Sequence, residues 1–385
     1  MDKYLEKLPT YVDEIKSIKG TIITNIVFIG ETPAPTFQEK RRSQLFLDRL
    51  AESQVDECTT DGYRNPIGII RGTSRTKPPI FVVAHLDTVI PRDIDHNYAV
   101  DETSITGPGL LDNSIGVGVL VSLPDIFKKL DLHFKSDIVL AGVIQSIGKG
   151  NLRGIRHLVK TWSTPIRGAI CIEGGELGRL NYNSDGMIRC EVECTIPVGN
   201  GWKYAFKPNA ILILNEVINQ ILQLRLPQKP RSRVIIGKIS GGMTHGDIAN
   251  SGTLGFEIQS DSDKMVKAIF NDIRDIVNGI SHEYRVDLNL NTISNLSASK
   301  LKYNHRLVKS AVAVMKKLDL KPVSEPTETE LSIFLSHKIP AVTLGITHGE
   351  NYHRPDARVE IDPIFKGITQ IIGIILAIDN GACDE

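Results

Sequence analysis

Several histidines and carboxylates, residue types that bind metals, lie at the ends of apolar stretches of this sequence or in the loops that follow them. His85 and Asp87 are two residues apart in AHLDT, the end of one apolar stretch. At this spacing the histidine can bind a metal while the carboxylate fixes its ring and tautomer from behind. An isolated pair of this kind is also common as an ordinary surface or core histidine, so the other candidates must support it.

The other candidates lie farther along the chain. Asp112 follows a glycine-rich turn in GPGLLDN, where a helix N-cap is the alternative role. Glu173 ends the apolar run ICIE, where a carboxylate is costly unless it meets a cation. His348 and His353 lie in the loop THGENYHRPD, where either could be an ordinary polar residue. Together, histidine and carboxylate form the donor mix that zinc prefers.

The apolar pattern explains how such distant residues could meet. From about Thr21 to Leu180, and again after Asn304, Val- and Ile-rich stretches alternate with amphipathic helical stretches. This alternation is typical of an α/β fold with a mixed, mostly parallel sheet covered by helices. AHLD, VIQS and CIEGG each fall at the carboxyl end of an expected strand, where such sheets form their sites.

From about Met187 the pattern changes to period-two alternation, beginning with MIRCEVECTIP. The expected order of elements there is β-α-β-β-α-β, which predicts a ferredoxin-like α+β unit. We therefore expect a metal-binding α/β domain at 1–186 and 304–385, interrupted by an inserted α+β domain at 187–303.

The composition argues against several partners. The 385 residues include 45 basic and 45 acidic side chains, so nothing favours nucleic acid or an anionic membrane. Five widely spaced cysteines without a CxxC pair predict reduced thiols in a cytoplasmic protein. The charged N-terminus does not look like a signal peptide, and the apolar runs look shorter than the roughly 20 residues of a membrane helix. We expect a soluble, cytoplasmic protein.

Over nearly its whole length the chain resembles the co-catalytic zinc exopeptidases and amidohydrolases. That family includes peptidase T, aminoacylase, carboxypeptidase G and succinyl-diaminopimelate desuccinylase. The resemblance rests on the domain insertion and on these segments: AHLDTV, GPGLLDNSIGVG, NLRGIRHL, IEGGELGRL, VIIGKISGG, KIPAVTLG and YHRPDARVEI.

The resemblance implies a site for two zinc ions. His85 would bind the first zinc, with Asp87 behind it as the catalytic-type carboxylate. Asp112 would bridge both ions, and Glu173 would complete the first ion's ligands. His353 would bind the second ion.

The family also places two adjacent glutamates in this site, a general base followed by a ligand of the second zinc. They should fall at Gln145 and Ser146, or at Ser146 and Ile147, yet no acid occurs between Ala141 and Gly154. Glutamine and serine cannot accept a proton near neutral pH, and loss of general acid–base help costs about 10²–10⁴-fold in rate. We therefore expect one zinc ion, with the second in doubt.

The inserted domain departs from the family as well. Family members use a histidine, an asparagine and an arginine of this domain to hold the substrate. The matching positions here carry Gly201 or Trp202, Gly246 and Gln259, so the substrate-binding residues remain unknown.

These departures leave three interpretations open. The first is a zinc-metallopeptidase-like protein with impaired or lost hydrolysis that binds a peptide or amino-acid-like ligand. The second is an active metal-dependent peptidase or amidohydrolase that has recruited another base, such as Glu176 or Glu350. The third is a non-catalytic interaction protein. In each, a homodimer through the inserted domain is expected from the resemblance.

Overall fold

The computed structural model describes residues 3–196, 208–327 and 329–384. The chain divides into two compact units. The larger comprises Met1–Asn183 and Lys300–Glu385, and the smaller comprises Ser184–Ser299.

The larger unit is built on a seven-stranded mixed sheet with the order β1-β2-β6-β3-β7-β15-β8. Its central strands β6, β3, β7 and β15 are parallel to one another, and the antiparallel pairs lie toward the edges. The central strands are fully buried, because helices cover both faces. The seven strands are β1 Glu57–Thr60, β2 Pro66–Ile70, β3 Ile80–His85, β6 Ile138–Val143, β7 Gly168–Gly175, β8 Leu180–Asn181 and β15 Ala341–Thr347.

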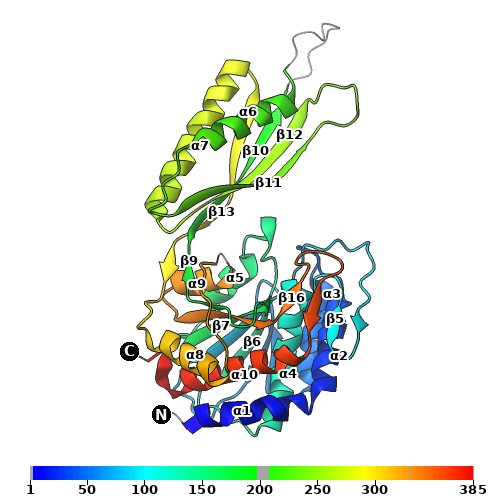
Figure 1. Cartoon of the computed structure of the whole chain (residues 1–385), viewed down its shortest axis with the longest axis vertical. Coiled ribbons are helices and arrows are strands. Elements are labelled where there is room, and N and C mark those ends of the chain that lie inside the picture. The colour runs from blue at the N-terminus through cyan, green and yellow to red at the C-terminus, as the bar shows by residue number, and fades with distance from the viewer. Residues whose placement is uncertain (1–2, 197–207, 328, 385) are drawn as a thin grey trace. The chain divides into compact units, whose positions relative to one another are not determined.

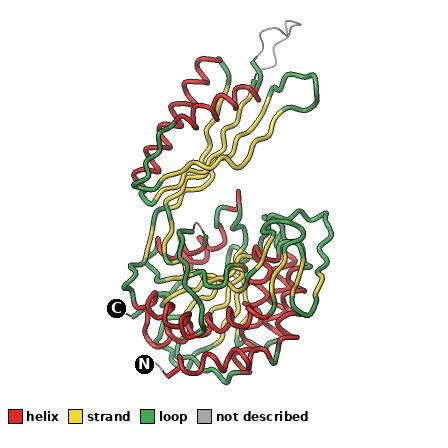
Figure 2. Tube along the Cα trace, in the orientation of Figure 1, coloured by secondary structure: helices red, strands yellow, loops and turns green. Residues whose placement is uncertain are grey.

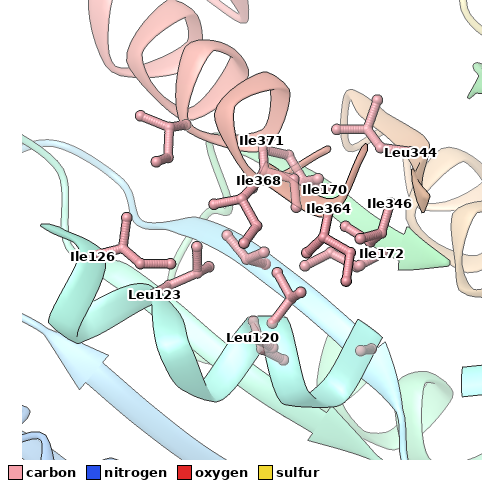
Figure 3. Packing of buried hydrophobic residues seen from close by; sticks show 14 of the residues in the cluster. Leu120, Leu123, Ile126, Ile170, Ile172, Leu344, Ile346, Ile364, Ile368 and Ile371 are labelled. Atoms are coloured by element: carbon pink, nitrogen blue, oxygen red, sulfur yellow. The ribbon is translucent and has the colours of Figure 1, made fainter. Parts of the chain in front are cut away.

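One face of this sheet is covered by long helices, as Figure 1 shows. Leucine and isoleucine side chains of α4 and α10 meet those of β7 and β15 in one apolar layer (Figure 3): Leu120, Leu123, Ile126, Ile170, Ile172, Leu344, Ile346, Ile364, Ile368 and Ile371. The helices of this side are α1 Lys3–Lys16, α2 Lys19–Gly30, α3 Lys40–Glu52, α4 Ile115–Lys129, α8 Arg306–Lys317 and α10 Asp362–Ala377.

Two shorter helices that contact each other, α5 (Arg153–Thr161) and α9 (Glu330–Ser336), cover the opposite face. The Phe81 ring of β3 makes edge contacts there with Trp162, just after α5, and with Phe334 of α9.

Strand alternation then decides where the candidate ligands point. Side chains two apart in a strand share a face, so His85 lies on the same side of β3 as Phe81. In β7, Ile170 and Ile172 face α4 and α10 in Figure 3, so Glu173 points to the side of α5 and α9.

The smaller unit is a four-stranded antiparallel sheet with the order β11-β12-β10-β13. Its two helices lie on one face of the sheet, as Figure 2 shows. Cys190 and Cys194 of β10 are buried in its core. The order β-α-β-β-α-β is the expected ferredoxin-like one: β10 Gly186–Thr195, α6 Ala210–Gln223, β11 Ser232–Gly241, β12 Ser251–Ser260, α7 Asp263–Tyr284 and β13 Asp287–Leu296.

One expectation from the sequence needs correction. Two helical stretches, Leu110–Lys129 and Asp362–Ala382, are long and apolar enough to cross a membrane by length and composition. The sequence did not predict stretches of this length, because small and polar residues interrupt each apolar run. Both are largely buried inside the larger unit, as core helices are. All five cysteines are free thiols, as expected.

Candidate metal centre

Three of the four expected metal ligands meet at the carboxyl edge of the main sheet. His85 ends β3, Glu173 lies near the end of β7, and Asp112 lies in the turn Leu110–Ser114 that leads into α4. One ligand atom from each lies within 4.8 Å of the others. Parallel strands end at one edge of a sheet, which explains how residues so far apart in sequence converge.

The His85 ring is held in one orientation. Its Nδ1 lies 3.0 Å from the Asp87 carbonyl oxygen and 3.6 Å from the Asp87 carboxylate. Its Nε2 lies 3.0 Å from Asp112 Oδ1. A ring that donates from Nδ1 to the Asp87 carbonyl presents the lone pair of Nε2 to the other two ligands.

Asp87 is fully buried, and its carboxylate accepts several hydrogen bonds. The donors are the Thr36 hydroxyl at 2.9 Å and the backbone N–H groups of Ser146 and Ile147 at 2.9–3.1 Å. Burial raises the pKa of Asp87, but the bonds from His85 and these N–H groups outweigh it, so its pKa is lowered. Asp87 is therefore an anchored anion behind the histidine.

Proton affinities at the site reflect crowded negative charge. Burial raises the pKa of Glu173 to about 7, and the carboxylates of Glu330 and Asp112 add to this rise. Burial lowers the pKa of His85, but hydrogen bonds to Asp112 and Asp87 outweigh it and hold the pKa well above its ordinary value. Both groups therefore bind protons where a cation would otherwise sit.

The donor set fits a divalent metal ion. It comprises an oriented imidazole nitrogen and two carboxylates, which is enough for one zinc ion with an open coordination position. Among the described residues, no lysine or arginine forms an ion pair with Glu173 or Asp112. A buried carboxylate without a cation is unfavourable, and a bound metal would supply that cation.

The fourth expected ligand lies nearby but is less enclosed. His353 is in the loop between β16 (Gly349–Glu350) and β17 (Arg358–Glu360), and its Nε2 lies 3.6 Å from Asp112 Oδ2. Its side chain is exposed. His348, the other histidine named from the sequence, lies just before β16 and lines a cavity whose lining does not include His353.

The segment without acids follows β6 directly. The Gln145 side chain is occupied elsewhere, because its Oε1 accepts a hydrogen bond from the Tyr63 hydroxyl at 2.7 Å. Ser146 and Ile147 bind the Asp87 carboxylate through their backbone N–H groups. The backbone that supports the site is thus intact, while its side chains offer no carboxylate.

One acidic residue of this region was missed in the sequence. Glu330, in the first turn of α9, is 3% exposed, and its Oε1 accepts a hydrogen bond of 2.5 Å from the Ser146 hydroxyl. An acid in the first turn of a helix is ordinarily explained by the helix dipole. The sequence offered no signal to separate that role from a place in the site.

The two acids named as replacement bases lie outside the ligand cluster. Glu176 is exposed and paired with Arg179 at 2.6 Å. Glu350 is exposed and lies 3.9 Å from Arg358.

The positions expected to hold a substrate in the inserted domain do not restore the family's groups. Gly201 and Trp202 lie outside the described residues. Gly246 lies in an exposed turn with open space where a side chain would be. Gln259 is buried, and its amide is bound between Arg233 and Glu257 of the same sheet.

A cavity of about 410 Å³ follows the end of β7. Its lining includes Glu176, Arg179, Asn181, Glu325 and His348. Arg179 also acts electrostatically on Glu173 and opposes the rise in its pKa.

No protein-family model matches the chain, and no curated protein matches it in sequence. Solved structures match it in fold. The dipeptidase Dug1p of Saccharomyces cerevisiae matches with a TM-score of 0.77 and 11% identity, over 97% of this chain and 99% of that one. The aminopeptidase PepT of Bacillus cereus matches with a TM-score of 0.69 and 15% identity, over 94% and 98%.

A third match is the YXEP protein of Bacillus subtilis, described as a dinuclear metal-binding peptidase of the M20 family. Its TM-score is 0.64 at 14% identity, over 94% of this chain and 98% of that one. At such identities the likeness establishes the fold. The chain has the fold of metal-dependent peptidases and amidohydrolases, as the resemblance implied.

Proposed function

We propose that this chain, with the fold of a metal-dependent exopeptidase, binds one zinc ion tightly and has impaired or lost hydrolysis. The observation that carries the proposal is the group His85–Asp112–Glu173, whose ligand atoms lie within 4.8 Å of one another beside a segment without an acid. A bound zinc ion would polarise a ligand carbonyl and acidify water at its open position.

The protein's own residues account for binding better than for turnover. Asp87 fixes the His85 ring, and the Ser146 and Ile147 N–H groups fix Asp87. Neither Gln145 nor Ser146 can take a proton from water and pass it to a leaving amine. The site can therefore hold a ligand without the usual proton transfer.

The proposed ligand is a short peptide or an amino-acid-like molecule. A cavity of about 410 Å³, lined in part by Glu176 and Leu177 just after β7, has the size of a small-molecule site. Its lining offers both signs of charge, Arg179 and Glu325, for the two charged ends of such a ligand.

The test combines zinc titration with a panel of dipeptides and N-acyl amino acids. We expect one tight zinc ion that His85→Ala abolishes, and turnover at least about 10²-fold below that of an enzyme with its base. Fast turnover that a chelator and His85→Ala both abolish would instead establish the active hydrolase.

A gain-of-function variant adds a second arm. Gln145→Glu with Ser146→Glu, and Ser146→Glu with Ile147→Glu, restore the acid pair in its two registers. Activity appearing in either pair supports the degenerate site.

We further propose that the chain is a cytoplasmic homodimer that associates through its inserted domain. Five unpaired thiols support the location. The support for association is strand β11, which is the edge strand next to β12 in the described part of the inserted unit.

A further inference from the structure

Glu330 reaches the site from the opposite direction to the other acids. The helix α9 that carries it packs against β7 and β15 and against α5. His85 and Glu173 point to this same side of the sheet, so the first turn of α9 faces the ligand cluster. The effects of Glu330 on the pKa values of His85, Glu173 and Cys171 indicate the same proximity.

The Glu330 carboxyl group is buried close to the other acids of the site. It is 3% exposed, and no lysine or arginine among residues 3–196, 208–327 and 329–384 forms an ion pair with it. Its hydrogen bond from the Ser146 hydroxyl, at 2.5 Å, satisfies one oxygen. The charged form of a buried carboxyl group is unfavourable unless a cation lies near it.

The position of Ser146 links this contact to the missing acid pair. In either register of the missing acid pair, Ser146 occupies one of the two positions. A serine side chain is too short to bring an oxygen as far into the site as a glutamate would. The carboxylate in contact with its hydroxyl instead belongs to Glu330, 184 residues away in sequence.

We propose that Glu330 supplies the carboxylate that the segment Gln145–Ile147 lacks, and that it supports a second divalent cation beside the group His85–Asp112–Glu173. The inference rests on the proposed function, because the second ion requires the first ligand group. Ser146 is the residue that positions Glu330, by donating its hydroxyl hydrogen to Oε1.

The experiment measures zinc stoichiometry and affinity by equilibrium dialysis of the full chain. Glu330→Gln keeps the shape and the hydrogen-bond acceptor but removes the charge. Ser146→Ala removes the hydrogen bond and keeps the charge. Glu350→Gln is the matched control, because it makes the same charge change in strand β16, outside the cluster.

In the wild type and in Glu350→Gln we expect a second, weaker zinc ion in addition to the one tight ion of the proposed function. In Glu330→Gln the second ion should bind at least about 10-fold more weakly, while the first ion keeps its affinity. Ser146→Ala should keep both ions, with a smaller effect on the second. Circular dichroism of each variant establishes that it is folded, and Glu330→Asp, which keeps the charge on a shorter side chain, replaces Glu330→Gln if that variant is not.

Three results would overturn the inference. A wild type that binds one ion, or a folded Glu330→Gln that binds two ions with wild-type affinity, removes the role of Glu330 and leaves the proposed function standing. A wild type that binds no zinc contradicts the proposed function itself.

Discussion

Protons and a metal ion compete for the same buried atoms of the site, and this competition decides the charge of its single residues. Glu173 has a pKa of about 7 in the metal-free fold, against an ordinary 4.5, because burial disfavours its charge. When folding raises the pKa of an acid, the folded state binds the proton more tightly than the unfolded state. The resulting contribution to the free energy of unfolding is fully present below the ordinary pKa. That contribution is lost as the pH rises through the folded value.

The stability of the metal-free protein should therefore fall as the pH rises from about 4.5 to about 7. His85, whose pKa is also raised, acts with the same sign at higher pH. For Glu173, a rise from 4.5 to about 7 corresponds to at most about 3 kcal/mol. In Glu173→Gln this loss should be absent.

The measurement is chemical denaturation of chelator-treated protein across that pH range. Glu350→Gln provides the comparison and should keep the wild-type slope. Equal slopes for wild type and Glu173→Gln would show that Glu173 is not a buried acid of the kind described.

The sequence predicted His85 and Glu173 because each ends an apolar stretch, and such stretches end at one sheet edge, while the role of Asp112 came from the family resemblance. Glu330 could not be predicted in this way. Its place in the site depends on how α9 packs on β7, and a short helix after a loop carries no sign of that packing.

At the level of elements, backbone hydrogen bonds join the segment after β6 to the start of α5. The N–H groups of Leu152, Arg153 and Gly154 donate to the carbonyls of Ser146, Gln145 and Ile144, respectively. These hydrogen bonds satisfy the first N–H groups of the helix, which have no partners within it. It also fixes the backbone that binds Asp87, whichever side chains it carries.

Gly154 is the residue that allows this close approach. A Cβ at Gly154 would lie 2.3 Å from the Ile144 carbonyl oxygen, a backbone atom that cannot move freely. We expect Gly154→Ala to lower the free energy of unfolding by about 1–3 kcal/mol or more, through overpacking, and to weaken zinc binding.

Gly148→Ala serves as the control in the same segment. Gly148 has a positive φ of 55° but open space around its Cβ position, so its cost should be only about 1 kcal/mol. Urea denaturation of both variants checks the difference. A Gly154→Ala variant as stable as Gly148→Ala would contradict the close packing.

These elements also show where the sequence was sufficient. Helix α5 and strand β6 follow from the apolar pattern of NLRGIRHLVKTW and SDIVLAGVIQ. Helix α2 was not predicted from the sequence, and its run TIITNIVFIG is apolar almost throughout. Its burial against α4 as a helix is a tertiary effect.

The whole molecule has two hydrophobic cores, one in each unit. The change from near-continuous apolar strands to period-two alternation anticipated this division. The expectation that every apolar run is too short for a membrane helix was wrong for the stretches of α4 and α10. Only the fold shows that these stretches are buried.

The inserted unit carries exposed apolar side chains at one edge. Ile235 and Ile239 of β11 are 41% and 53% exposed, and Ile211 of the adjacent helix α6 is 44% exposed. An exposed edge strand readily pairs with another chain. We expect Ile239→Lys to convert a dimer into a monomer, as measured by sedimentation velocity.

The control for association is Asn291→Lys, on the opposite edge strand β13, which should remain dimeric. A monomeric wild type, or an Ile239→Lys variant that still dimerises, would contradict association through β11.

The central claim is that His85, Asp112 and Glu173 hold a metal ion, and a crystal structure of the zinc-treated protein with anomalous scattering at the zinc edge tests it most directly. The account predicts a strong peak among His85 Nε2 and the carboxylates of Asp112 and Glu173. An anomalous map without a peak at this position, with His85 and Glu173 hydrogen-bonded only to protein atoms, would contradict the account.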